Sequence, residues 1–144
     1  MKKTLHSILG VTLLEIMLVL AIASMVILMS IRYYQSASTN QKINATINTI
    51  TGIVAAGESV LGATGAVPTS TTILPYLPGG ALPNSPFGGP VTMTPATATS
   101  YNIVINTGAG CQQIKTLIQQ NNKLTTASPC AAKAENALTI LVNE

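Results

Sequence analysis

The stretch Gly10-Val11-Thr12-Leu13-Leu14-Glu15, continued by the run from Ile16 to Ile31, decides the fold of this chain. The run contains two serines, Ser24 and Ser30, and no other polar side chain. Together with the apolar residues before Glu15, it reaches the length of roughly 20 residues that a helix needs to cross a bilayer. The sequence therefore predicts a membrane-spanning helix with one carboxylate about a turn from its N-terminal end.

Glu15 is a candidate functional residue because an ionised carboxylate within hydrocarbon is costly unless it is paired. Cleavage of the chain after Gly10 would give Val11 a free α-amine, four residues before Glu15. That amine can pair with Glu15 of the same chain or with Glu15 of a neighbouring copy, and the attraction is strong where the dielectric constant is low. We therefore expect Glu15 to act in assembly.

The N-terminus resembles the class III signal peptide of type IV pilins and the related pseudopilins. The resemblance lies in Lys2 and Lys3, in the short leader ending at Gly10, and in the spacing from Gly10 to Glu15. It implies that a prepilin peptidase cuts between Gly10 and Val11 and methylates the new N-terminus at Val11. An ordinary secretory signal is the alternative, because Ala21-Ile22-Ala23 imitates its cleavage motif, although Glu15 would then interrupt the apolar region.

The composition argues against an enzyme and against a nucleic-acid-binding protein. The formal net charge of +3 falls to +1 without Lys2 and Lys3, which is too little for a phosphate backbone. No His follows His6 and the chain has no Asp, so a catalytic triad and a His-based metal site are excluded after cleavage. We expect no catalytic residue, no metal and no cofactor. Only 8% of the residues are charged, and such a surface favours association.

Residues 11 to about 62 are predicted to form one long helix, because no Pro occurs before Pro68. Beyond the membrane part, apolar residues recur at helical spacing and predict a stripe that packs in a core. This stripe consists of Ile43, Ile47, Ile50, Val54 and Leu61. The expected organisation is a leader at residues 1–10, a transmembrane and filament-core helix at 11–34, and a globular domain at 35–144.

The remainder of the chain predicts a small sheet. Residues 62–100 are rich in Gly and Pro and are expected to form loops, with Ile73 to Leu77 as a short apolar piece on the helix. Strands are expected at 91–94, 101–106 and 138–142, the last in a central position. A helix is expected from Cys111 to about Lys123, with Ile114, Leu117 and Ile118 on one face. The predicted class is α+β, a long N-terminal helix against a small antiparallel sheet.

Cys111 and Cys130 are the two cysteines of the chain. An even count in a chain with an export signal predicts a disulfide, with two reduced buried cysteines as the alternative. The bond would close a loop of 18 residues and contribute about 3 kcal/mol in the chain-entropy model. The pair also resembles the C-terminal disulfide-bounded region of type IV pilins.

Two shorter stretches resemble the type IVb pilins, and bundle-forming pilin in particular. One is Tyr33 to Ser38. The other is the turn at Asn84 to Gly88, which resembles a family motif of Asn, Pro, Phe, any residue and Gly, with Ser85 inserted after Asn84. Two departures, the short leader and the small globular part, leave a type IVa-like pilin open.

The resemblance implies a type IV pilin fold and a structural function. The precursor would lie in the bacterial inner membrane, and an assembly platform with its ATPase would polymerise identical subunits into a helical surface filament. Such filaments serve attachment, aggregation or motility. One alternative is a major pseudopilin of a type II secretion system, although members of that group usually bind calcium through acidic loops. Another is a minor pilin acting as an adhesin or a DNA-uptake module.

Overall fold

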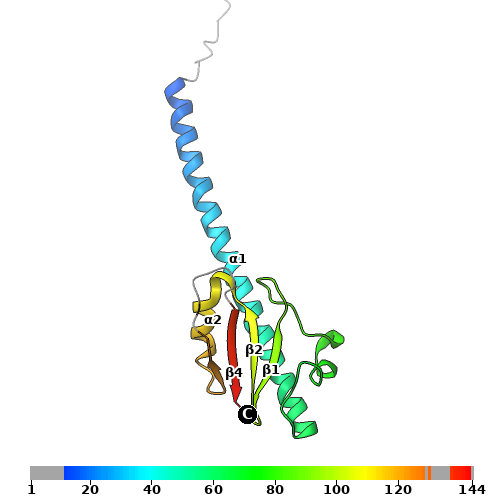
Figure 1. The fold of residues 1–144 in the computed structure, drawn as a ribbon. Helices are drawn as coiled ribbons and strands as arrows, with labels where there is room; N and C mark the ends of the chain where they lie inside the picture. The colour runs from blue at the N-terminus through cyan, green and yellow to red at the C-terminus, as the bar shows by residue number, and fades with distance from the viewer. Residues whose placement is uncertain (1–11, 129, 131–136, 144) are drawn as a thin grey trace, which may run out of the picture. The chain divides into compact units, whose positions relative to one another are not determined.

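The structure is a computed structural model that describes residues 12–128, 130 and 137–143. Its elements are α1 (Leu13–Thr64), β1 (Thr92–Thr97), β2 (Ser100–Asn106), α2 (Cys111–Ile118), β3 (Leu124–Thr126) and β4 (Ala137–Asn143) (Figure 1). Three short 3-10 helices lie in the connections: η1 (Leu74–Tyr76), η2 (Pro78–Gly80) and η3 (Gly108–Gly110). The predicted α+β class, with a long N-terminal helix and a small antiparallel sheet, is confirmed.

The chain divides into two compact units between Ala37 and Ser38, both of which lie within α1. In the first unit, every described residue from Thr12 to Ala37 is exposed. The second unit has its own core, whose first member along the chain is Ile43. The two units therefore differ in what their apolar side chains contact.

Local capping sets the ends of α1. The Thr12 hydroxyl accepts a hydrogen bond from the backbone N–H of Glu15 at 3.3 Å, as an N-cap residue does. At the other end, Gly65 adopts a φ of +66° and donates its N–H to the Leu61 carbonyl at 2.8 Å. A glycine in this left-handed conformation ends a helix without steric cost. The helix runs two residues past the predicted end, and Val11 lies outside the described residues.

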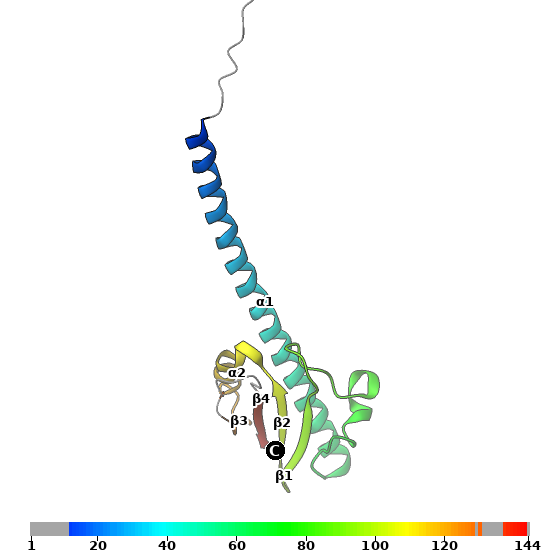
Figure 2. The ribbon, with the colours of Figure 1, turned by 45° about the horizontal axis from the view of Figure 1, so that its top comes forward.

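The sheet of the second unit has the strand order β1-β2-β4-β3, all antiparallel. β4 occupies a central position, as its apolar run predicted. Buried side chains face each other across β2 and β4 in the pairs Tyr101 with Val142, Ile103 with Ile140, and Ile105 with Leu138. In both ribbon views the later part of α1 runs along the sheet (Figures 1 and 2). The core thus lies between one face of the sheet and one face of α1.

The buried face of α1 differs in detail from the predicted stripe. Ile43 and Ile50 are buried as expected, but further along the helix the deepest residues are Ile53 and Val60. The predicted members Val54 and Leu61 are only partly buried. Ile73 and Leu77 of the 65–90 loop also enter the core.

The helix predicted from Cys111 to about Lys123 is present but ends earlier, so the predicted C-terminal end was wrong. α2 ends at Ile118, and Leu124–Thr126 forms the short strand β3 beside β4. The amide-rich segment between them makes turns, in which Asn121 Oδ1 accepts the Lys123 N–H at 3.1 Å. Of the three apolar residues expected on one face of this helix, Ile114 and Ile118 are buried, whereas Leu117 is 42% exposed.

Candidate functional site: the apolar segment of α1 and its carboxylate

The first turn of α1 places Glu15 at the third helical position after the Thr12 cap. The Thr12 carbonyl accepts the N–H groups of Glu15 and Ile16 at 3.0 and 3.2 Å, so the helix begins directly after Thr12. A carboxylate in the first turn also suits the positive end of the helix dipole. The sequence Thr12-Leu13-Leu14-Glu15 has the spacing of a capping box. Gly10 and Val11, the predicted cleavage and methylation positions, lie outside the described residues.

The segment from Leu13 to Ile31 is apolar around its whole circumference and is exposed throughout. Its polar side chains are Glu15, Ser24 and Ser30. The Ser24 hydroxyl donates to the Ala21 carbonyl at 2.8 Å, so the helix itself satisfies this group. Among the described residues α1 is the one helix long and apolar enough to cross a membrane. A helix that is apolar on all sides requires lipid or other protein around it.

Glu15 has no ion-pair partner among the residues that the structure describes. The nearest cation in the described part of α1 is Arg32, which is 17 residues away. At 1.5 Å per residue this separation is about 25 Å along the helix, far beyond salt-bridge range. The one ion pair of the described residues joins Lys123 Nζ to the carboxylate of Glu58, near the other end of α1, at 2.8 Å. The residues that the structure describes therefore supply no cation to Glu15.

The disulfide expected from the cysteine count is present between Cys111 and Cys130. Cys111 is buried at the first residue of α2, and Cys130 packs against the core. The bond therefore holds the segment that contains α2 and β3 to the core. Sequence spacing alone also allowed two reduced thiols, and the fold decides between them by bringing the two Cα atoms to 5.8 Å.

The turn that resembles the pilin motif packs against η3. The Phe87 ring lies over Gly108 and Gly110, where an added Cβ would stand 2.7 and 3.1 Å from ring atoms. Lys42 Nζ lies 5.8 Å from the ring centroid. Ser85, the inserted residue, is buried and donates its hydroxyl to the Asn106 carbonyl. The insertion thus ties the turn to β2, a role that the motif comparison did not predict.

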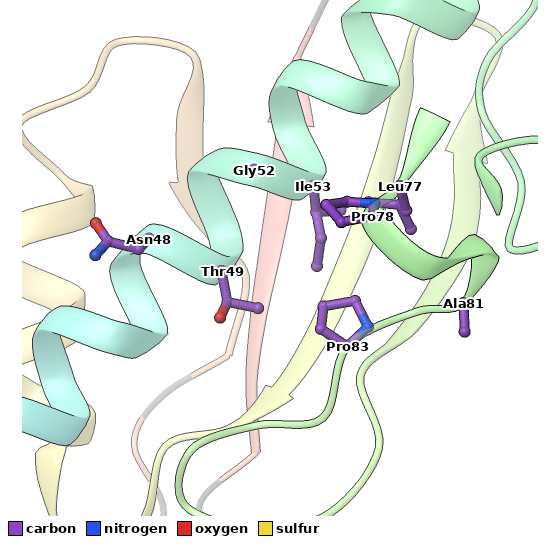
Figure 3. A pocket seen from close by; sticks show the side chains of 8 residues that line it. All are labelled: Asn48, Thr49, Gly52, Ile53, Leu77, Pro78, Ala81 and Pro83. Carbon is purple, nitrogen blue, oxygen red and sulfur yellow. The ribbon is translucent and has the colours of Figure 1, made fainter. Parts of the chain in front are cut away.

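An apolar groove of about 330 Å³ lies in the second unit, between α1 and the loop that contains η1 and η2. We call it the Gly52 groove. α1 contributes Asn48, Thr49, Gly52 and Ile53, and the loop contributes Leu77, Pro78, Ala81 and Pro83. Figure 3 shows the Ile53 side chain directed from α1 towards the rings of Pro78 and Pro83. No charged residue lines the groove, and the sequence offered no signal for it because its two walls are far apart in the chain.

No known protein family matches the chain, and no match is found among curated proteins or among solved structures. What the chain does is therefore inferred from its own residues and geometry.

Proposed function

We propose that this chain is a type IV pilin, a subunit that lies in the inner membrane and then polymerises through α1 into a surface filament. The supporting observation is the exposed apolar segment Leu13–Ile31, whose one carboxylate lies in the first helical turn. Such a segment needs lipid before assembly and other apolar helices after it. The weak charge of the chain favours association of copies over repulsion between them.

In the proposed mechanism, a prepilin peptidase cuts after Gly10 and methylates Val11. The Val11 amine of one subunit then pairs with Glu15 of its neighbour, which fixes the axial register of two helices. The cost of leaving an unpaired carboxylate in an apolar bundle disfavours other registers. The second unit, from Ser38 onwards, has its own core and would cover the bundle. The filament is thus held by helix contacts, and the protein performs no chemistry of its own.

Substitution of Glu15 tests the mechanism in a host that supplies the peptidase, the assembly platform and its ATPase. Glu15→Ala and Glu15→Gln are both expected to abolish sheared surface fibres while cleavage after Gly10 continues. Glu15→Gln keeps the size of the side chain and its ability to serve in the capping box, so its failure to assemble would identify the charge as the cause. The readouts are fibre yield and mass spectrometry of the mature N-terminus.

Ser24→Ala provides the matched control within the same segment. The Ser24 hydroxyl is satisfied by the Ala21 carbonyl of its own helix, so its removal should leave fibre yield near that of the parent chain. Normal fibres from Glu15→Gln would contradict the ion-pair mechanism. A mature chain that does not begin at Val11 would contradict the assignment to this family.

A further inference from the structure

One edge of β4 is covered by a short strand. β2 pairs with every residue of β4, whereas β3 on the other side pairs with Ile140, Leu141 and Val142 alone. The pairing of so short a strand is marginal unless other contacts support it. The cover on this edge of β4 therefore depends on what else holds β3 in place.

Burial and the disulfide hold the segment that contains α2 and β3. Ile114 and Ile118 of α2 and Leu124 of β3 are buried in the core. The disulfide joins Cys111, the first residue of α2, to Cys130 beyond β3, so that both elements lie within one closed loop. An open loop has more conformations away from the sheet than a closed one. Loss of the bond therefore raises the fraction of molecules in which β3 has left β4.

The sequence of β4 makes the edge that faces β3 a site for strand addition once it is exposed. Its seven residues, Ala-Leu-Thr-Ile-Leu-Val-Asn, include no charge, no Pro and no Gly. Uncharged segments of this length with high β-propensity pair readily between chains when their edge is open. β3 is therefore a protective cover as well as a member of the sheet.

We propose that reduction of the Cys111–Cys130 disulfide releases β3 from β4, and that β4 of a second copy of the chain then takes its place. The reductant is a dithiol, which supplies two electrons and two protons. It leaves the two cysteines as thiols and becomes a disulfide itself. The proposal goes beyond the filament function, since this contact uses no residue of the contact through α1.

β4 of a second copy is the strand that fits this edge. Among the described strands, β1 carries Pro95 and an irregular register, β2 is already paired on both sides, and β3 has three residues. An antiparallel pair centred on Ile140 places Leu138 opposite Val142 of the other copy. These three side chains are the buried ones of β4, so this register keeps the apolar faces of both sheets on the same side.

The backbone of β4 also suits this register. On the edge that faces β3, the Thr139 carbonyl accepts the N–H of Ala127 at 2.9 Å. Hydrogen-bonding positions alternate along a strand, so Leu141, two residues further on, directs its backbone groups to the same edge. In the pair centred on Ile140, Thr139 of one copy exchanges hydrogen bonds with Leu141 of the other. Both copies make the same contact, and the product is a closed dimer.

Hydrogen exchange of the full chain in micelles of a non-ionic detergent tests the release of β3. After addition of dithiothreitol to a dilute sample, the Ala127 amide is expected to exchange about 100-fold faster, the factor that corresponds to loss of the loop restraint. The amides of β2 should keep their protection, because β2 stays paired with β1 and β4. Unchanged exchange at Ala127, or equal acceleration in β2, would overturn the selective release of β3.

Light scattering after size-exclusion chromatography tests the second step at higher concentration in the same micelles. The protein mass per particle is expected to double on reduction. The double variant Cys111→Ser with Cys130→Ser should reach the same mass without a reductant. An unchanged mass after reduction would contradict strand addition.

Two lysine substitutions in the reduced chain locate the contact. Thr139→Lys places an ammonium group on the outer face of β4, where the symmetric pair brings the groups of both copies close together, so the dimer should not form. Thr94→Lys is the matched control on β1, which β2 separates from β4, and its dimer should form as in the parent chain. Association that is insensitive to Thr139→Lys would place the contact elsewhere and refute the proposal.

Discussion

Gly57 and Tyr101 show how a single missing Cβ shapes the core. The fully buried Tyr101 ring lies against α1 at Gly57, where an added Cβ would overlap the Tyr101 Oη and stand 3.0 Å from Cζ. Gly57 belongs to α1 and Tyr101 to β2, and because both elements are packed along their length, neither residue can move away freely. The glycine therefore exchanges some helix propensity for a close contact between helix and sheet.

We expect Gly57→Ala to lower the free energy of unfolding by about 1–3 kcal/mol, the usual cost of overpacking a core. Gly52→Ala is the control at the neighbouring helical glycine and should raise the stability by up to about 1 kcal/mol, because its Cβ meets open space. Denaturant unfolding of the second unit, followed by circular dichroism, measures both. Equal effects of the two substitutions would show that the Tyr101 contact does not constrain Gly57.

At the scale of elements, the sheet edges are poorly suited to pairing with another strand. β1 carries Pro95, which has no N–H, and its register shifts between Pro95 and Thr97. At the other edge, β3 has only three residues, Leu124–Thr126. Short edges, proline and irregular register are the means by which proteins prevent strand addition. Both edges of the sheet are therefore poor sites for the addition of a strand from another chain.

The segment containing α2 and β3 depends on the disulfide more than the rest of the sheet does. α2 is only eight residues long and β3 only three, so neither is stable without tertiary contacts. Glu58 and Lys123 add an exposed ion pair, which contributes little. The Cys111–Cys130 bond therefore restrains this segment in addition to the burial of Ile114, Ile118 and Leu124.

Replacing both cysteines, Cys111→Ser with Cys130→Ser, should destabilise the second unit by about 3 kcal/mol. The physical reason is that the open chain gains conformational entropy when unfolded. Thermal unfolding of the doubly substituted chain against the parent measures the loss, and the parent treated with a reductant should show the same shift. A melting temperature that is insensitive to both treatments would contradict this role.

At the scale of the whole molecule, the two units differ in whether their apolar side chains are buried or exposed. Among the described residues, the core of the second unit begins at Ile43, whereas those of the first unit are exposed and mostly apolar. The second unit therefore has what it needs to fold without the first. The first unit needs an apolar surrounding that its own chain does not supply.

Removal of residues 1–37 is expected to yield a soluble monomer that keeps its disulfide and unfolds cooperatively. Size-exclusion chromatography without detergent gives the oligomeric state, and calorimetry gives the cooperativity. The full chain under the same conditions is expected to aggregate, because its exposed apolar helix lies in water. Aggregation of the shortened chain, or the absence of a cooperative transition, would show that the first 37 residues contribute to the core.

Sequence patterns predicted most of the fold because a long run of similar residues identifies its element even where single residues depart from the pattern. The apolar run and the absence of proline predicted α1, and the apolar strand at 138–142 predicted a central position that β4 occupies. The prediction failed where the signal was short. β3 has three residues and takes its structure from pairing with β4, and α2 stops where amide side chains form turns instead of helix. Helical spacing grouped Ile114, Leu117 and Ile118 on one face of α2, but spacing does not say how far neighbouring elements cover each of them.

The sequence by itself determined the apolar helix, its single carboxylate and the α+β class, because each depends on the order of residues along one element. The candidate assembly residue Glu15 was found in this way. Tertiary structure alone decided the contact of Gly57 with Tyr101, the hydrogen bond from Ser85 to the Asn106 carbonyl, and the Gly52 groove. Each of these joins residues far apart in the chain, and local patterns contain no information on which distant segments will meet.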